Sequence, residues 1–65
     1  MITLINLHTV LGIAATLLLR DSLTKKCIGT KDIIDFKETN YFKMNCHKKV
    51  RVARTLKENV YIVYL

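Results

Sequence analysis

Proline and tryptophan are absent from this sequence, and glycine and cysteine are scarce. The chain contains two glycines and two cysteines in 65 residues. The glycines, Gly12 and Gly29, stand apart and cannot form a glycine-rich loop that holds phosphate. No metal-ligand cluster is visible, and no nucleophile, base and orienting group stand at a suitable spacing. We therefore expect a protein that is not an enzyme and uses no cofactor.

The cysteine content also limits the class of protein. Cys27 and Cys46 show no CxxC spacing and no secretory signal precedes them. We expect reduced thiols in a cytoplasmic protein, and the spacing to His8 or His47 disfavours metal binding. A chain of this length forms one small domain, residues 1–65, whose core is marginal. A homodimer is the expected source of additional stability.

The first nineteen residues carry no charge and are rich in leucine and isoleucine. Apolar residues recur at 3, 4, 3, 4 spacing, which predicts a long apolar helix over residues 1–20 that forms the core and the dimer contact. The stripe consists of Leu4, Leu7, Leu11, Ala14 and Leu18.

A single membrane span over residues 1–19 is the main alternative, because the length suffices to cross a bilayer. The basic tail would then lie in the cytoplasm and contact anionic lipid or an acidic partner. Asn6 and His8 argue against a span, since both are costly in lipid unless another helix satisfies them. On either interpretation we expect His8 to be structural.

Positive charge is concentrated in the second half of the chain. The formal net charge is +6, and all of it lies after Leu23. Between Lys43 and Lys57 there are six basic residues and no carboxylate before Glu58. Such an asymmetry indicates nucleic acid or an anionic membrane surface as the partner.

Two helices and a strand are predicted beyond Thr30. Thr30 is expected to cap a short helix that ends at Glu38, and Asn45 to cap a basic helix over residues 46–59. Residues 60–65 are β-branched and aromatic, which favours a terminal strand. A competing interpretation makes residues 41–52 and 59–65 the two strands of a hairpin, because Val50 and Val52 alternate. The expected fold class is mainly α, with three helices and a short C-terminal β strand.

This order of elements resembles small helix-turn-helix proteins of the winged-helix kind over residues 30–65. The resemblance rests on Ile33-Ile34-Asp35-Phe36, on the turn from Tyr41 to Asn45, and on the stretch from Val50 to Lys57. In that family the second helix of the motif lies in the major groove and contacts base edges. Carried over, the base-contacting positions are His47, Lys48, Arg51 and Thr55.

The sequence thus predicts a dimeric transcriptional regulator that binds duplex DNA through the helix over residues 46–59. Arginine can donate two hydrogen bonds to guanine, and lysine and arginine neutralise phosphates. A solvated or protein-binding face is the plainer alternative. The predicted nucleic-acid contacts are Lys43, His47, Lys48, Lys49, Arg51, Arg54 and Thr55.

Overall fold

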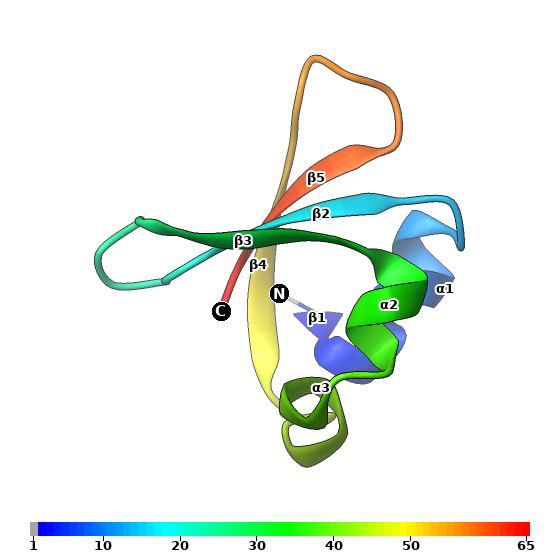
Figure 1. The fold of residues 1–65 in the computed structure, drawn as a ribbon, viewed down its shortest axis with the longest axis vertical. Helices are drawn as coiled ribbons and strands as arrows, with labels where there is room; N and C mark the ends of the chain where they lie inside the picture. Colours follow the sequence, from blue (N-terminus) through cyan, green and yellow to red (C-terminus); the bar gives the residue numbers. More distant parts are fainter. Residues whose placement is uncertain (1) are drawn as a thin grey trace.

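The computed structural model describes residues 2–65, which form five strands and four short helical segments (Figure 1). In chain order the elements are β1 (Ile2–Thr3), the 3-10 helix η1 (Leu4–Asn6), α1 (Leu7–Leu11), β2 (Thr16–Arg20), β3 (Cys27–Asp32), α2 (Ile33–Lys37), α3 (Asn40–Met44), β4 (Lys49–Arg54) and β5 (Val60–Tyr64).

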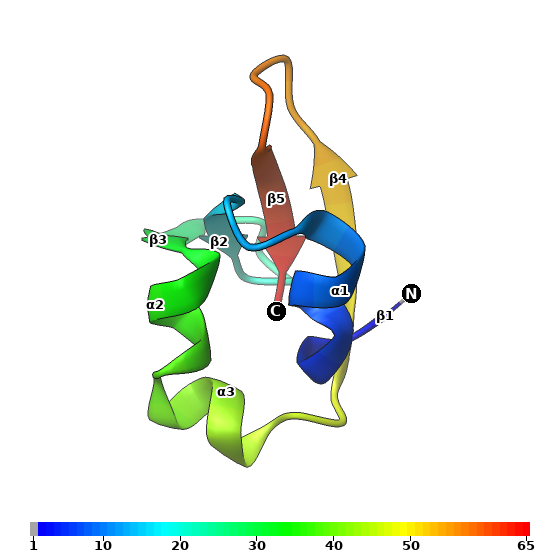
Figure 2. The same ribbon diagram turned by 90° about the vertical axis from the view of Figure 1, so that its right-hand side faces the viewer.

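The five strands form one mixed sheet in the order β1-β4-β5-β2-β3. The central strands β2 and β5 are parallel, with Thr16 opposite Val60 and Arg20 opposite Tyr64. All other neighbours are antiparallel. Figures 1 and 2 show α1, α2 and α3 on the same side of the sheet, so its other face is left without a helical cover.

Side chains of β2 alternate between the two faces, as the period of two in a strand requires. Leu17 and Leu19 are buried beneath the helices, whereas Thr16, Leu18 and Arg20 are half-buried on the other side. We call this other side the open face of the sheet. Residues that are paired across strands share a face, so the register assigns the remaining strand residues to one face or the other.

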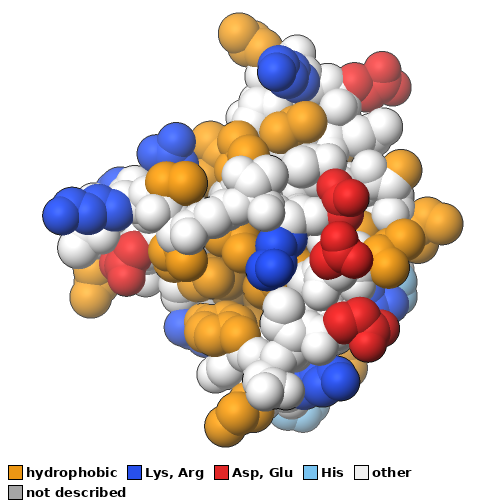
Figure 3. Space-filling view, in the orientation of Figure 1, with side chains coloured by type: hydrophobic (Ala, Val, Ile, Leu, Met, Phe, Trp, Pro, Cys, Tyr) orange, Lys and Arg blue, Asp and Glu red, His pale blue; other side chains and the backbone are white. Residues whose placement is uncertain are grey.

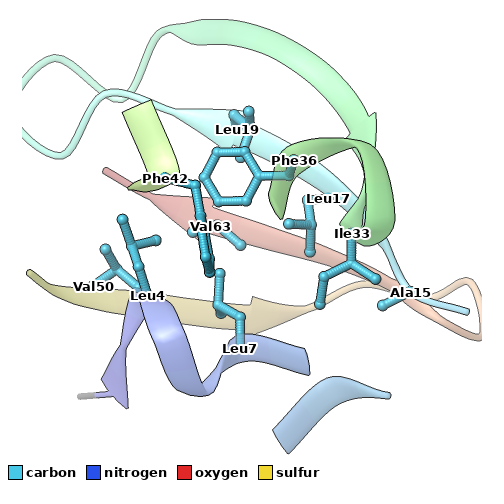
Figure 4. Close-up of a cluster of buried hydrophobic side chains, with 10 residues drawn as sticks. All are labelled: Leu4, Leu7, Ala15, Leu17, Leu19, Ile33, Phe36, Phe42, Val50 and Val63. Atoms are coloured by element: carbon cyan, nitrogen blue, oxygen red, sulfur yellow. The ribbon is translucent and has the colours of Figure 1, made fainter. Parts of the chain in front are cut away.

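The core lies between the sheet and the helices (Figure 4). Phe36 from α2 and Phe42 from α3 pack edge to face, with ring centroids 5.6 Å apart. Each fully buried aliphatic or aromatic side chain contributes about 1.5–3 kcal/mol. The buried residues are Leu4, Leu7, Ala15, Leu17, Leu19, Ile33, Phe36, Phe42, Val50 and Val63.

The prediction of a long apolar helix over residues 1–20 is wrong. The segment divides into β1, η1, α1 and β2, and α1 ends where Gly12 adopts φ 88° and donates its N–H to the His8 carbonyl. Pairing of Thr16–Arg20 with β3 and β5 then satisfies the backbone of the second half as a strand. Of the predicted stripe, Leu4 and Leu7 are buried, Leu11 is half-buried, Ala14 is exposed, and Leu18 lies on the open face.

The prediction of a basic helix over residues 46–59 is also wrong. Lys49–Arg54 is a strand that pairs antiparallel with β5, with Val52 opposite Val63. The competing hairpin interpretation is confirmed in this pairing, although its first strand begins at Lys49 and not at Tyr41. The segment forms a strand because its β-branched residues pair with those of β5, and this pairing outweighs the helical spacing of its apolar residues.

The mainly α, three-helix, winged-helix-like fold is therefore contradicted, because the sheet dominates the structure. The predicted caps are displaced too. Thr30 belongs to β3, and Asp32 precedes α2. Thr39, rather than Asn45, caps a helix, since its hydroxyl accepts from the Phe42 N–H at 3.2 Å. Asn45 instead ends α3.

Gly12 is required by the backbone at the end of α1. Its φ of 88° and ψ of 162° are accessible to almost no residue except glycine. A methyl group added at Gly12 or at Gly29 would meet no atom within 4 Å, so packing does not distinguish the two positions. We expect Gly12→Ala to lower the free energy of unfolding by about 1–3 kcal/mol.

Urea unfolding measures this loss, with Gly29→Ala as the matched control. Gly29 lies in β3 with an ordinary backbone, so its replacement should leave stability unchanged or raise it slightly. Equal unfolding midpoints for the two variants would show that the strained backbone at Gly12 does not matter.

Candidate nucleic-acid interface

Strand β4 presents two of its three charged residues, Lys49 and Arg51, to the open face of the sheet. Lys49 is paired with Thr3, and Arg51 with Tyr64, and both basic side chains are exposed. Val50, between them, is buried in the core. The alternation in a strand therefore places two basic side chains on one surface while it anchors the strand by the other.

A tyrosine ring lies at the centre of the charged region. The Lys25 ammonium is 4.8 Å from the centroid of the Tyr64 ring, and the Arg51 guanidinium carbon is 5.9 Å from it. Arg20 is paired with Tyr64 across β2 and β5, so it lies on the same face. Cations at such distances are attracted to the ring electrons. We call Arg20, Lys25, Lys49, Arg51 and Tyr64 the cationic sheet face.

Arg20 is positioned by the turn that joins β2 to β3. Its Nη1 donates to the Lys25 carbonyl at 3.3 Å. Its Nε is buried, and within residues 2–65 it has no hydrogen-bond partner. The side chain is thus fixed at one end of the sheet, and one of its donors is unsatisfied.

The same turn holds Lys25 near Tyr64. The Asp21 carboxylate accepts from the backbone N–H groups of Leu23 at 2.7 Å and Thr24 at 2.9 Å, which is an Asx-type turn. The Lys25 N–H donates to the Asp21 carbonyl at 2.9 Å, and Lys25 has a positive φ of 64°. This local network directs the lysine side chain back over the sheet.

Hydrogen bonds from Thr24 and Leu23 lower the pKa of Asp21 below its ordinary value of 3.8, because they stabilise the carboxylate. Since the folded pKa is lowered, the stabilisation is present above about pH 4 and is lost as the pH falls through the lowered pKa. We expect the amide resonances of Leu23 and Thr24 to shift with a midpoint below pH 3.8. An NMR titration measures that midpoint.

Asp21→Asn is the control for this titration, because it keeps an acceptor oxygen but has no carboxyl group. The two amide resonances should then lose their acid transition. A midpoint at or above the ordinary value in the unmodified protein would contradict the hydrogen-bonded turn.

Three of the five acidic residues lie away from the cationic sheet face, whereas Asp21 lies in the same turn as Lys25. Asp32, Asp35 and Glu38 flank or belong to α2, and Figure 3 shows acidic side chains gathered over this helix. Asp32 is also paired with Thr16, whose hydroxyl donates to its carboxylate at 3.2 Å. Thr16 and Arg20 are the two ends of β2, roughly 13 Å apart. The open face is therefore basic at the Arg20 end.

The structure separates the seven residues that the sequence predicted as nucleic-acid contacts. Lys43 lies on α3, and His47 and Lys48 lie in the exposed loop that follows α3. Arg54 is paired with Tyr61 on the helix-covered side, and the Thr55 hydroxyl donates to the Val60 carbonyl at 2.8 Å within the hairpin.

Two of the predicted contacts, Lys49 and Arg51, share the open face. The sequence interpretation did not include Arg20, Lys25 or Tyr64 in the site. The spacing of two between Lys49 and Arg51 could have indicated that both side chains lie on one face of a strand. Nothing local in the sequence links that side to Arg20, because the pairing of β2 with β5 is distant in the chain.

Other site classes find little support in the described part of the chain. Residues 2–65 contain no group of three or more histidine, cysteine or acidic side chains that could hold a metal ion. Cys27 and Cys46 are free thiols, and the Cys46 thiol donates to the Phe42 carbonyl at 3.2 Å. Within the same residues, no helix has the length and apolar character needed to cross a bilayer.

Comparisons with protein-family models, with curated proteins and with solved structures find no match to this chain.

Proposed function

We propose that the protein binds nucleic acid through the cationic sheet face. The observation that carries the proposal is the convergence of basic side chains from β2, the β2–β3 turn and β4 on Tyr64. No single segment of the chain supplies this group of charges. The site replaces the recognition helix that the sequence suggested, and it keeps two of the predicted contacts.

The chemistry of the face suits a phosphodiester backbone. Arginine offers planar, two-pronged donors to phosphate, and lysine neutralises phosphate as a point charge. Half-buried Leu18 and Ile62 are paired beside the charges and give the surface an apolar strip on which sugars or bases can rest. Strands and sheets contact nucleic acid in several known binding modes, so a recognition helix is not required.

Binding to a labelled 20-nucleotide duplex and to its separate strands, followed by fluorescence anisotropy, tests the proposal. With four basic side chains on phosphates, the slope of log K against log salt should be roughly −3 to −4. The duplex and single-strand measurements show which form is preferred. Absence of binding to either form at low salt would exclude the proposal.

A single substitution distinguishes binding through the cationic sheet face from binding that depends only on net charge. Arg51→Gln should weaken binding by about three- to tenfold and reduce the salt slope by about one unit, because one phosphate contact is lost. Lys43→Gln removes the same charge from the exposed surface of α3 and should change affinity little. Equal losses in the two variants would indicate that only net charge matters.

Two further expectations accompany this function. An intracellular location fits a protein with a nucleic-acid partner and free thiols. Dimerisation, expected from the small size of the chain, stays a prediction that a native mass measurement tests.

A further inference from the structure

A groove of about 490 Å³ lies on the helix-covered side, where the β2–β3 turn approaches α2 and the loop that precedes β4. Its volume is within the range of sites that bind small ligands. Most of its lining is apolar. The apolar side chains are Leu19, Leu23, Ile28, Phe36 and Leu65.

Two of these apolar side chains are strongly exposed to solvent. Leu23 is 90% exposed, and Ile28 is 58% exposed. Single exposed apolar residues are common on protein surfaces, but these two meet at the same groove as the buried Phe36. A ligand that covered them would remove that apolar surface from water.

Positive charge is available at the rim of the groove. Lys31 is paired with Leu17 and so lies on the helix-covered side, and Lys48 donates to the Tyr41 hydroxyl at 2.9 Å. An ammonium group has three donors, so Lys48 can donate to a ligand as well. Asp21 also lines the groove. Its carboxylate accepts two backbone hydrogen bonds within its own turn and is attracted by the Lys48 ammonium, so Lys31, Lys48 and Asp21 together leave one net positive charge.

The hydroxyl of Thr39, which also lines the groove, is already engaged. The Thr39 hydroxyl donates to the Phe36 carbonyl at 2.7 Å and accepts from the Phe42 N–H. The groove thus combines a long apolar wall with two lysines, and it offers little to a ligand that needs many hydrogen bonds along its length.

We infer that the groove binds an amphiphile with one alkyl chain and a carboxylate head group. The chain covers Leu23 and Ile28, and the carboxylate pairs with Lys31 and Lys48. Lys31 and Leu19 lie on the opposite side of the sheet from Arg51, whereas the β2–β3 turn borders both this groove and the cationic sheet face.

Sodium decanoate, added below its micelle concentration to ¹⁵N-labelled protein, tests the inference by NMR. Saturable shifts are expected at Leu23, Ile28 and Tyr41. Decan-1-ol has the same chain without the charge and should bind about tenfold more weakly, because two lysine contacts are lost. Shifts confined to other parts of the surface, or none at all, would overturn the inference.

Two sets of variants distinguish the role of the lysine charges from that of the apolar contact with the ligand's alkyl chain. Lys31→Gln with Lys48→Gln should weaken decanoate about tenfold and leave decanol unchanged. Leu23→Ser should weaken both ligands about tenfold, and it removes a side chain that is exposed in the free protein, so the fold should persist. Lys43→Gln serves as the charge control. Decanoate binding that is insensitive to the double substitution would contradict the role of the lysines.

Discussion

Replacing Phe36 by alanine is expected to unfold most of the protein at room temperature. Phe36 is 2% exposed and packs edge to face on Phe42, so it joins α2 and α3 over the sheet (Figure 4). Removal of a buried phenyl ring costs about 3–5 kcal/mol. In a chain below about 70–80 residues a single hydrophobic core rarely supplies more than about 3–5 kcal/mol of stability, so the loss consumes most or all of it.

Urea unfolding measures the loss of stability, and the spread of amide resonances in an NMR spectrum shows whether the fold persists. Ile34→Ala provides the control. Ile34 belongs to the same helix but is 57% exposed, so its truncation should cost less than about 0.5 kcal/mol. Phe36→Leu keeps an apolar side chain and should be intermediate. If Phe36→Ala unfolded at the urea concentration of the unmodified protein, the core described for this sheet would be wrong.

Removal of three charges from the cationic sheet face is expected to abolish most nucleic-acid binding. The variant combines Arg20→Gln, Lys49→Gln and Arg51→Gln. Each lost phosphate contact reduces the salt slope by about one unit, so affinity near 0.1 M salt should fall by roughly two orders of magnitude. The fold should persist, because the three residues lie on the open face and outside the core.

A matched variant removes three charges elsewhere, through Lys37→Gln, Lys43→Gln and Arg54→Gln. Lys37 and Lys43 lie on the helices, and Arg54 is on the helix-covered side of β4. We expect its affinity to stay within a few-fold of the unmodified protein, and its circular dichroism spectrum to be unchanged. A hundredfold loss in this variant as well would show that the partner responds to net charge and not to the sheet face.

The basic segment from Lys43 to Lys57 shows which properties can be predicted from the sequence and which cannot. Its excess of lysine and arginine over carboxylates is a property of the sequence, and the prediction of a polyanion partner rests on it. The direction of each side chain depends on whether the period is 3.6 or two. The helical assignment placed Arg51 and Arg54 on one surface, whereas the strand places them on opposite surfaces.

The first twenty residues show the same ambiguity. Their apolar spacing fitted a helix, and Leu4 and Leu7 are buried. The turn at Gly12 is local, because its N–H donates to the His8 carbonyl. The strand from Thr16 to Arg20 depends on its pairing with β5, which lies far along the chain and which no local window contains.

Three properties of the protein can be read from its residues alone: the excess of positive charge after Leu23, the apolar material for a small core and the strand at Val60–Tyr64. The neighbours of that strand depend on the complete fold, in which it lies parallel to β2 and thereby brings Arg20 next to Tyr64. This is so because the backbone groups of β2 and β5 satisfy one another although the two strands are far apart in the chain, and their pairing overrides the local helical periodicity.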